Sequence, residues 1–155
     1  MKPRRIWWAR PRKLCALERP GGGGRSHRPE RRAAEIEYLK ERGVRLVISL
    51  MRTRHNLEAY EAAGLAWRHE PGATLDDVLA LLRRELRGRG AVAIHGDHRT
   101  GLPVAVCAAH LHDARGADPA GALAAAAAAG LGVDAAACEL VGVDPGEVER
   151  RLSER

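Results

Sequence analysis

The sequence predicts an α/β domain with a mostly parallel central sheet flanked by helices. The run Val-Arg-Leu-Val-Ile-Ser-Leu at 44–50 is nearly all apolar and rich in β-branched residues, as in parallel strands covered on both faces. Helical and strand-like segments alternate along the chain. The 155 residues suffice for one domain with a substantial core. We expect one domain over 1–155, with a basic, glycine-rich entry segment (1–30), a core (31–125) and C-terminal helices (126–155).

The first part of the chain contains two short strand candidates, a loop and a helix. The apolar groups at 6–9 and 14–17, set among basic residues, are expected to form strands. Four consecutive glycines at 21–24 predict a flexible loop. Apolar residues at three- and four-residue spacing predict a helix over 29–42, which Gly43 ends.

After the central strand, the alternation continues. A short helix over 57–63 is expected, followed by a strand over 65–69. Thr74 is suited to cap the next helix, because its hydroxyl can accept a backbone N–H and two acidic residues follow in the first turn. That helix is expected to continue to Gly88.

The last part of the chain is predicted to hold one more strand and three helices. The strand is expected at 91–94 and the first helix at 102–114. Asp118-Pro119 and Asp144-Pro145 begin the other two helices, because proline is favoured at the first helical position.

The charge of the chain is strongly positive. Lysine and arginine total 26 against 20 acidic residues, a net charge of +6, and only Lys2, Lys13 and Lys40 are lysines. A composition rich in arginine and alanine arises from a GC-rich genome, or it attracts an anionic partner such as a phosphoester, a nucleic acid or an acidic peptide. Nucleic acid is the less favoured partner, because few aromatic residues lie among the arginines at 4–12 and 25–32.

The cysteines give no disulfide framework and no zinc site. Cys15, Cys107 and Cys138 are odd in number and widely spaced, without a Cys-x-x-Cys pair. No apolar run approaches the roughly 18 uncharged residues of a membrane span, and no apolar segment follows the basic start of the chain as in a secretory signal. We therefore expect a cytoplasmic, reducing location and no membrane association. The sequence leaves the oligomeric state open.

The segment from His95 to Gly101 contains the clearest functional pattern. A strand-like run ends in His95, a short turn follows, and Arg99-Thr100-Gly101 opens an alanine-rich helical stretch. Backbone N–H groups at a helix start and a guanidinium fork can together hold phosphate oxygens. The alternatives are a solvated Arg99, which would meet the unfavourable end of the helix dipole, and a hydrogen-bonded core histidine at 95. His95 and His98 lack a third ligand, so neither a metal nor another cofactor is expected.

This segment resembles the signature loop, His-Cys-(five residues)-Arg-Thr/Ser-Gly, of the cysteine-dependent tyrosine and dual-specificity phosphatases, in particular their small bacterial-type members. The resemblance extends over about residues 14–125 and follows the order of that family's elements. Similar segments are the entry segment at 14–20, the helix and strand at 37–50, the strand before the general-acid loop at 64–71 and the buried helix at 104–107. The resemblance implies a single phosphatase-like domain over 1–155 with the dual-specificity-phosphatase fold.

The resemblance also implies a role for each matching residue. Arg99 would hold the phosphate oxygens, Thr100 would replace the hydroxyl that assists thiolate departure, and His95 would match the residue that lowers the thiol pKa. The ligand would be a phosphorylated protein or a small phosphomonoester. The phosphate-binding set implied in this way is Gly96, Asp97, His98 and Arg99.

The chain departs from the family pattern at both catalytic loops. No cysteine lies among the three residues between His95 and Arg99, where the family has six residues. Cys107 lies about 12 Å further along the predicted helix, and we expect it to be a small buried residue. The carboxylates nearest to the general-acid position are Asp76 and Asp77, which are also explained as charges at a helix N-terminus.

Three functions follow from these observations. The first is a tyrosine or dual-specificity phosphatase that hydrolyses phosphomonoesters through a cysteinyl-phosphate, which requires a complete loop with a cysteine. The second is a pseudophosphatase that descends from such an enzyme and captures phosphorylated partners without turnover. The third, less favoured, is an arginine-rich nucleic-acid-binding protein.

Overall fold

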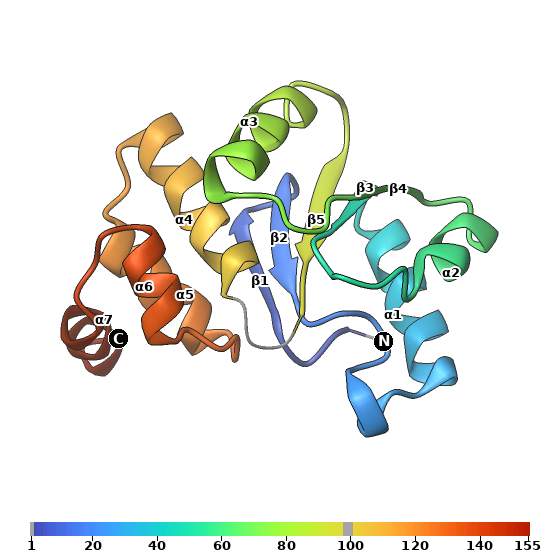
Figure 1. The fold of residues 1–155 in the computed structure, drawn as a ribbon, viewed down its shortest axis with the longest axis horizontal. Helices are drawn as coiled ribbons and strands as arrows, with labels where there is room; N and C mark the ends of the chain where they lie inside the picture. The colour runs from blue at the N-terminus through green and yellow to red at the C-terminus, as the bar shows by residue number, and fades with distance from the viewer. Residues whose placement is uncertain (1, 98–100) are drawn as a thin grey trace.

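The computed structural model describes residues 2–97 and 101–155 and contains a five-stranded sheet with helices on both faces (Figure 1). β2 pairs with β1 in antiparallel fashion, whereas β2, β5, β3 and β4 are all mutually parallel. The predicted α/β fold with a mostly parallel sheet is therefore confirmed. In spatial order the strands are β1 (Ile6–Arg10), β2 (Leu14–Leu17), β5 (Ala91–His95), β3 (Val44–Ser49) and β4 (Ala66–His69).

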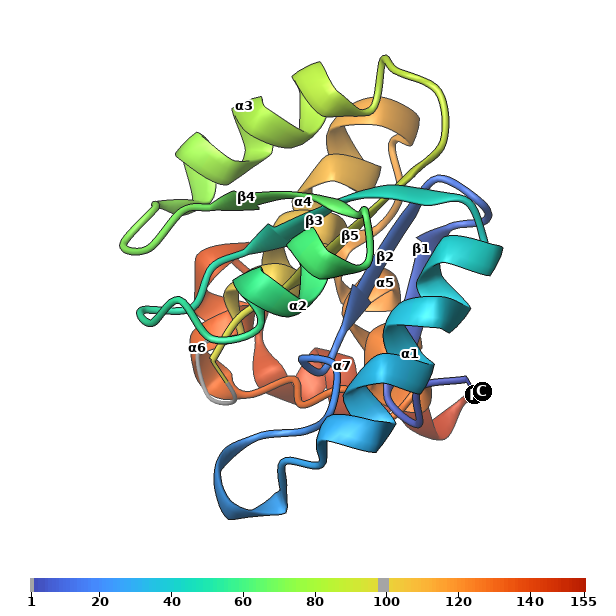
Figure 2. The same ribbon diagram turned by 90° about the vertical axis from the view of Figure 1, so that its right-hand side faces the viewer.

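Two groups of helices cover the sheet, as Figure 2 shows from the side of α1 and α2. Because successive strand side chains point to opposite faces, Leu14 and Ala16 pack against one group while Cys15 and Leu17 pack against the other. One group comprises α1 (Pro29–Glu41) and α2 (Leu57–Ala62). The other comprises α3 (Leu75–Glu85), α4 (Leu102–Arg115), α5 (Pro119–Ala128), α6 (Ala135–Leu140) and α7 (Pro145–Ser153).

The structure differs from the sequence expectation in a few places. The helix expected to reach Gly88 ends at Glu85, and the Lys13 ammonium group binds the carbonyls of Gly88 and Gly90 in the turn that follows. The helix α6 is not anticipated, because six residues are too few to display an apolar period; Asp134 caps it by accepting the Ala137 N–H at 2.9 Å.

The glycine-rich segment contains a short 3-10 helix, η1 (Gly24–Ser26), and its first turn is fixed to α1. The Gly21 N–H donates to the buried Glu35 carboxylate at 3.0 Å. Gly21 has a φ of +88°, and a Cβ at this position would lie 2.5 Å from the His27 ring. Both facts require glycine here.

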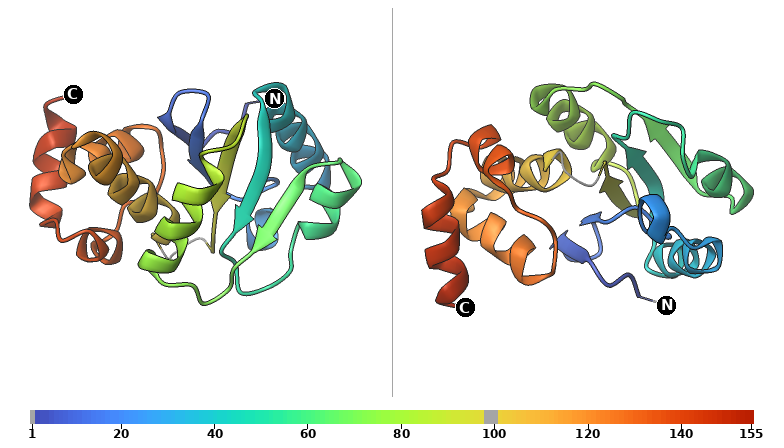
Figure 3. Two further views of the ribbon diagram at one scale, coloured as in Figure 1. Left: turned by 90° about the horizontal axis from the view of Figure 1, so that it is seen from above. Right: turned by 60° about the horizontal axis from the view of Figure 1, so that its bottom comes forward.

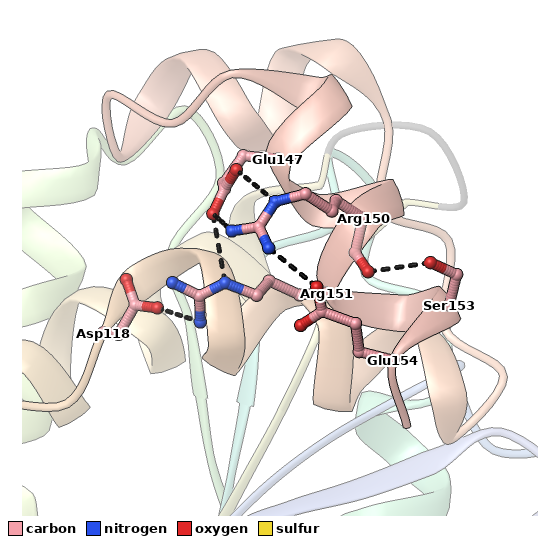
Figure 4. A network of polar contacts seen from close by, with 6 residues as sticks. All are labelled: Asp118, Glu147, Arg150, Arg151, Ser153 and Glu154. Carbon is pink, nitrogen blue, oxygen red and sulfur yellow. Dashed lines mark hydrogen bonds and ion pairs between the residues drawn. The ribbon is translucent and has the colours of Figure 1, made fainter.

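The C-terminal helix α7 is joined to the start of α5 by ion pairs (Figure 4). Arg151 binds Asp118, the residue before α5, and also Glu147 one turn earlier on α7. Because these groups are only partly buried and remain in contact with water, the pairs orient α7 more than they stabilise it. The buried residue of α7, Val148, provides its apolar contact with the core.

Candidate functional site

The carboxyl ends of the four parallel strands lie along one edge of the sheet. Ligands of open α/β sheets bind outside such an edge. The β5–α4 connection starts there with Gly96 and Asp97 and ends at Gly101. The segment before β1, the β2–α1 loop and the α5–α6 connection lie at the same edge, which the right panel of Figure 3 brings forward. His98, Arg99 and Thr100, three of the residues singled out from the sequence, lie outside the described residues.

His95 is the last residue of β5 and is completely buried. Its Nε2 lies 2.7 Å from the hydroxyl oxygen of Tyr60 on α2, which is also buried. Burial, with smaller effects from Arg19 and His55, lowers the pKa of His95 to about 3, although a contact with the Gly96 backbone partly opposes this. His95 is therefore neutral at physiological pH and supports the β5–α4 connection from inside the protein.

Replacing Tyr60 with phenylalanine is expected to reduce the unfolding free energy by about 1–3 kcal/mol, because it leaves a buried ring nitrogen of His95 without its partner. Urea denaturation of the two proteins measures this difference. Tyr38→Phe is the matched control, since Tyr38 is buried on α1 but its hydroxyl makes no hydrogen bond in the described part of the chain. Equal destabilisation by the two substitutions would contradict the role of the Tyr60–His95 contact.

The loops that leave the strands are joined to one another at this edge. The Asp97 carboxylate accepts the Arg52 N–H, at 3.2 Å, from the β3–α2 connection. In the same connection the Met51 carbonyl lies 2.7 Å from Nε2 of His69, at the end of β4. These contacts join the β3–α2 connection to Asp97 on one side and to the end of β4 on the other.

Gly101 ends the β5–α4 connection and precedes the first turn of α4. It has a φ of +64°, and a Cβ there would lie 2.8 Å from Cβ of Ala137 and 3.0 Å from Oδ1 of Asp134. A larger residue would push α4 away from α6. The close contact sets where α4 begins, with its free N–H groups at the carboxyl edge.

A cavity of about 390 Å³ opens beside Gly96, Asp97 and Gly101. It also contacts the polar residues Glu18 and Arg19, which follow β2 directly in the sequence. Arg19 is not identified by the sequence analysis, although its position just after a strand is a usable signal. The apolar wall consists of Ala16, Leu17, Pro103, Val104, Ala127 and Leu131.

The two candidate general acids, Asp76 and Asp77, are exposed in the first turn of α3. Asp77 and Thr74 form a capping box: each side chain accepts the backbone N–H of the other residue, at 3.1 and 3.2 Å. These bonds lower the pKa of Asp77, which favours the ionised form rather than the protonated form that a general acid requires. Neither carboxylate lines the cavity beside Gly96.

All three cysteines are buried on different elements: Cys15 on β2, Cys107 on α4 and Cys138 on α6. Burial raises the pKa of each thiol, so the nucleophilic thiolate is disfavoured. None of the three lines the cavity. The expectation that Cys107 is a buried packing residue is confirmed.

The described residues contain no group of three His, Cys, Asp or Glu side chains arranged to hold a metal ion. In that same part of the protein, no helix is both long and apolar enough to cross a membrane.

No protein-family model and no curated protein matches the chain. Solved structures do match it over nearly their full length. Human DUSP28 has 19% identity and a TM-score of 0.64, with 97% of this chain and 98% of that chain covered. Tk-PTP in its active form has 19% identity and a TM-score of 0.63, with 95% and 97% covered. TpbA of P. aeruginosa has 21% identity and a TM-score of 0.62, with 90% and 86% covered.

The names Tk-PTP and DUSP28 are those of a protein tyrosine phosphatase and a dual-specificity phosphatase, and the mixed α/β fold of this chain matches these structures. The resemblance found in the sequence is therefore confirmed at the level of the fold. This chain has the fold of the small protein tyrosine and dual-specificity phosphatases.

Proposed function

We propose that this protein uses the phosphatase fold to bind phosphorylated proteins or small phosphomonoesters without hydrolysing them through a cysteine. The observation that carries this proposal is the position of the cysteines. The segment between His95 and Gly101 contains none, and the three in the chain are buried elsewhere with raised thiol pKa values. Covalent hydrolysis requires a thiolate that can reach phosphorus.

Several features support the binding part of this proposal. Gly96 and Asp97 lie at the carboxyl edge of the sheet beside a cavity, and α4 starts at the same place. A helix start supplies N–H groups to an anion, and the resemblance assigns the guanidinium of Arg99 to the same phosphate. One structural relative, a variant of TpbA, is solved in complex with pTyr, so phosphotyrosine is the ligand class to test first. The unpaired cysteines fit the reducing cytoplasm that the sequence favours.

The test combines binding with turnover on the purified full chain, with its mass verified. We expect a phosphotyrosine peptide to bind at least about tenfold more tightly than its unphosphorylated form, since charge-assisted hydrogen bonds distinguish the two. We also expect no phosphate release and no hydrolysis of para-nitrophenyl phosphate. Hydrolysis that a thiol alkylator abolishes would instead identify a working cysteine phosphatase. Equal affinities for the phosphorylated and unphosphorylated peptides would contradict the proposal that this protein binds phosphate.

A further inference from the structure

Two adjoining cavities form one groove along the carboxyl edge. The first, described above, reaches Gly96 and Asp97. The second, of about 470 Å³, runs along the glycine-rich segment to Gly24 and Ser26. The two cavities are lined in common by Arg5, Glu18, Arg19 and Gly23. We call this combined space the basic groove.

The basic groove carries more positive than negative charge. Its second cavity is lined by four arginines, at 4, 5, 19 and 31, and by a single carboxylate, Glu18. Glu18 lies 3.7 Å from Arg5 and 3.8 Å from Arg31, and Arg31 also binds Glu35 at 2.8 Å. Neither Arg4 nor Arg19 has a carboxylate within ion-pair distance in the described part of the chain. An anion entering the groove therefore meets uncompensated guanidinium groups.

Arg19 is the central cation of the groove, because it lines both cavities and, unlike Arg5, has no carboxylate within ion-pair distance among the described residues. It is half-buried, and its Nη1 lies 3.3 Å from Nδ1 of His55 and 3.9 Å from the sulfur of Met51. A Cβ at position 23 would lie 2.8 Å from Nη2 of Arg19, so Gly23 leaves the space that the guanidinium occupies. A guanidinium positioned in this way can bind a carboxylate with two parallel hydrogen bonds at little further entropic cost.

The size and lining of the groove favour a peptide over a small phosphomonoester. A single phosphate would occupy only the end beside Gly96, which leaves the arginine-lined cavity unfilled. The apolar wall of the first cavity, which includes Leu17 and Val104, suits the ring or alkyl part of a side chain. A peptide chain can span both parts and place an acidic side chain near Arg19.

We propose that the basic groove recognises acidic residues that flank the phosphorylated residue of a partner protein. This inference rests on the proposed function, since it places the partner's phosphate at the β5–α4 connection. Arg19 and Arg5 bind the acidic side chains, and the phosphate site beside Gly96 binds the phosphoryl group.

The test uses four peptides that share one sequence around a central tyrosine, which is phosphorylated or not and flanked by either glutamates or glutamines. Fluorescence anisotropy at physiological salt gives their affinities. We expect the glutamate phosphopeptide to bind about tenfold more tightly than the glutamine phosphopeptide, as two charge-assisted hydrogen bonds allow. Arg19→Gln should remove this preference, so that the ratio of the affinities for the glutamate and glutamine phosphopeptides falls toward one.

Two further variants keep the result interpretable. Arg5→Gln should reduce the glutamate preference without affecting folding, because the Arg5 side chain is 53% exposed. Arg89→Gln is the matched control. Arg89 is an exposed residue that precedes β5, so it lies at the amino edge of the sheet, opposite the groove. Circular dichroism verifies the fold of each variant.

The glutamate preference and the phosphate preference report separately on the two proposals. Equal affinities for the two phosphopeptides, or a glutamate preference that survives both Arg19→Gln and Arg5→Gln, would overturn the role of the groove. Loss of the phosphate preference alone would contradict the proposed function and leave the acidic preference intact. A single-stranded DNA that displaces the acidic peptide at lower concentration than the peptide itself would assign the groove to nucleic acid and overturn the inference.

Discussion

Replacing Arg99 with alanine is expected to weaken binding of a phosphotyrosine peptide by about 100-fold or more. The resemblance to the phosphatase loop assigns this guanidinium to two phosphate oxygens, and each charge-assisted hydrogen bond contributes about 1.5–3 kcal/mol. A loss of about 3 kcal/mol corresponds to a factor of more than 100 in the dissociation constant. Arg99→Lys should recover only part of the affinity, because an ammonium group cannot make the paired contact.

Isothermal titration with the phosphopeptide and with vanadate measures the effect of Arg99→Ala. Arg89→Ala removes the same charge from the amino edge of the sheet and should change neither affinity. Its inclusion separates a local contact from a general effect of net charge. Unchanged affinity in Arg99→Ala, with the fold intact, would rule out the phosphate loop as the binding site.

Acidification below about pH 6.5 is expected to destabilise the protein through His95. Burial lowers the pKa of His95 to about 3, whereas the unfolded chain titrates near the ordinary value of about 6.5. Between these two pKa values the unfolded state binds more protons than the folded state. The contribution of neutral His95 to the unfolding free energy is therefore complete above about pH 6.5 and decreases as the pH falls toward 3. Each pH unit costs up to about 1.4 kcal/mol, which amounts to a loss of about 3 kcal/mol between pH 7 and pH 4.

Urea denaturation at a series of pH values measures this dependence. His95→Gln should be less stable at pH 7 and should flatten the profile between pH 6.5 and 4, because the titrating group is gone. His112→Gln, which replaces an exposed histidine at the end of α4, is the control for the loss of a histidine at another position. His55 and His110 also have lowered pKa values and add a smaller slope of the same sign. A profile that is as steep in His95→Gln as in the parent protein would contradict this assignment.

The order and type of most elements could be predicted from the sequence, because they depend on local patterns. The apolar run at 44–50 forms the central strand β3, and Thr74 caps α3 as its hydroxyl and the following acidic residues predict. The short helix α6 could not be predicted, since its stability depends on contacts with α4 and on the cap from Asp134.

The candidate site, too, could be predicted from the sequence only in part. The sequence identifies the segment from His95 to Gly101 and the lack of a cysteine within it, since both are properties of neighbouring residues. It does not reveal that Tyr60, 35 positions away, is the partner of His95. The sequence analysis also does not identify Arg19, whose signal is limited to its position just after a predicted strand.

The sequence by itself thus determined the fold class, the position of the segment proposed to bind phosphate and the lack of a cysteine within it. The tertiary structure decided the burial of the three cysteines, the neutral state of His95 and the alignment of Arg5 and Arg19 in one groove. Burial and charge compensation depend on groups that meet only when distant segments fold together, and the pKa of a side chain depends on both.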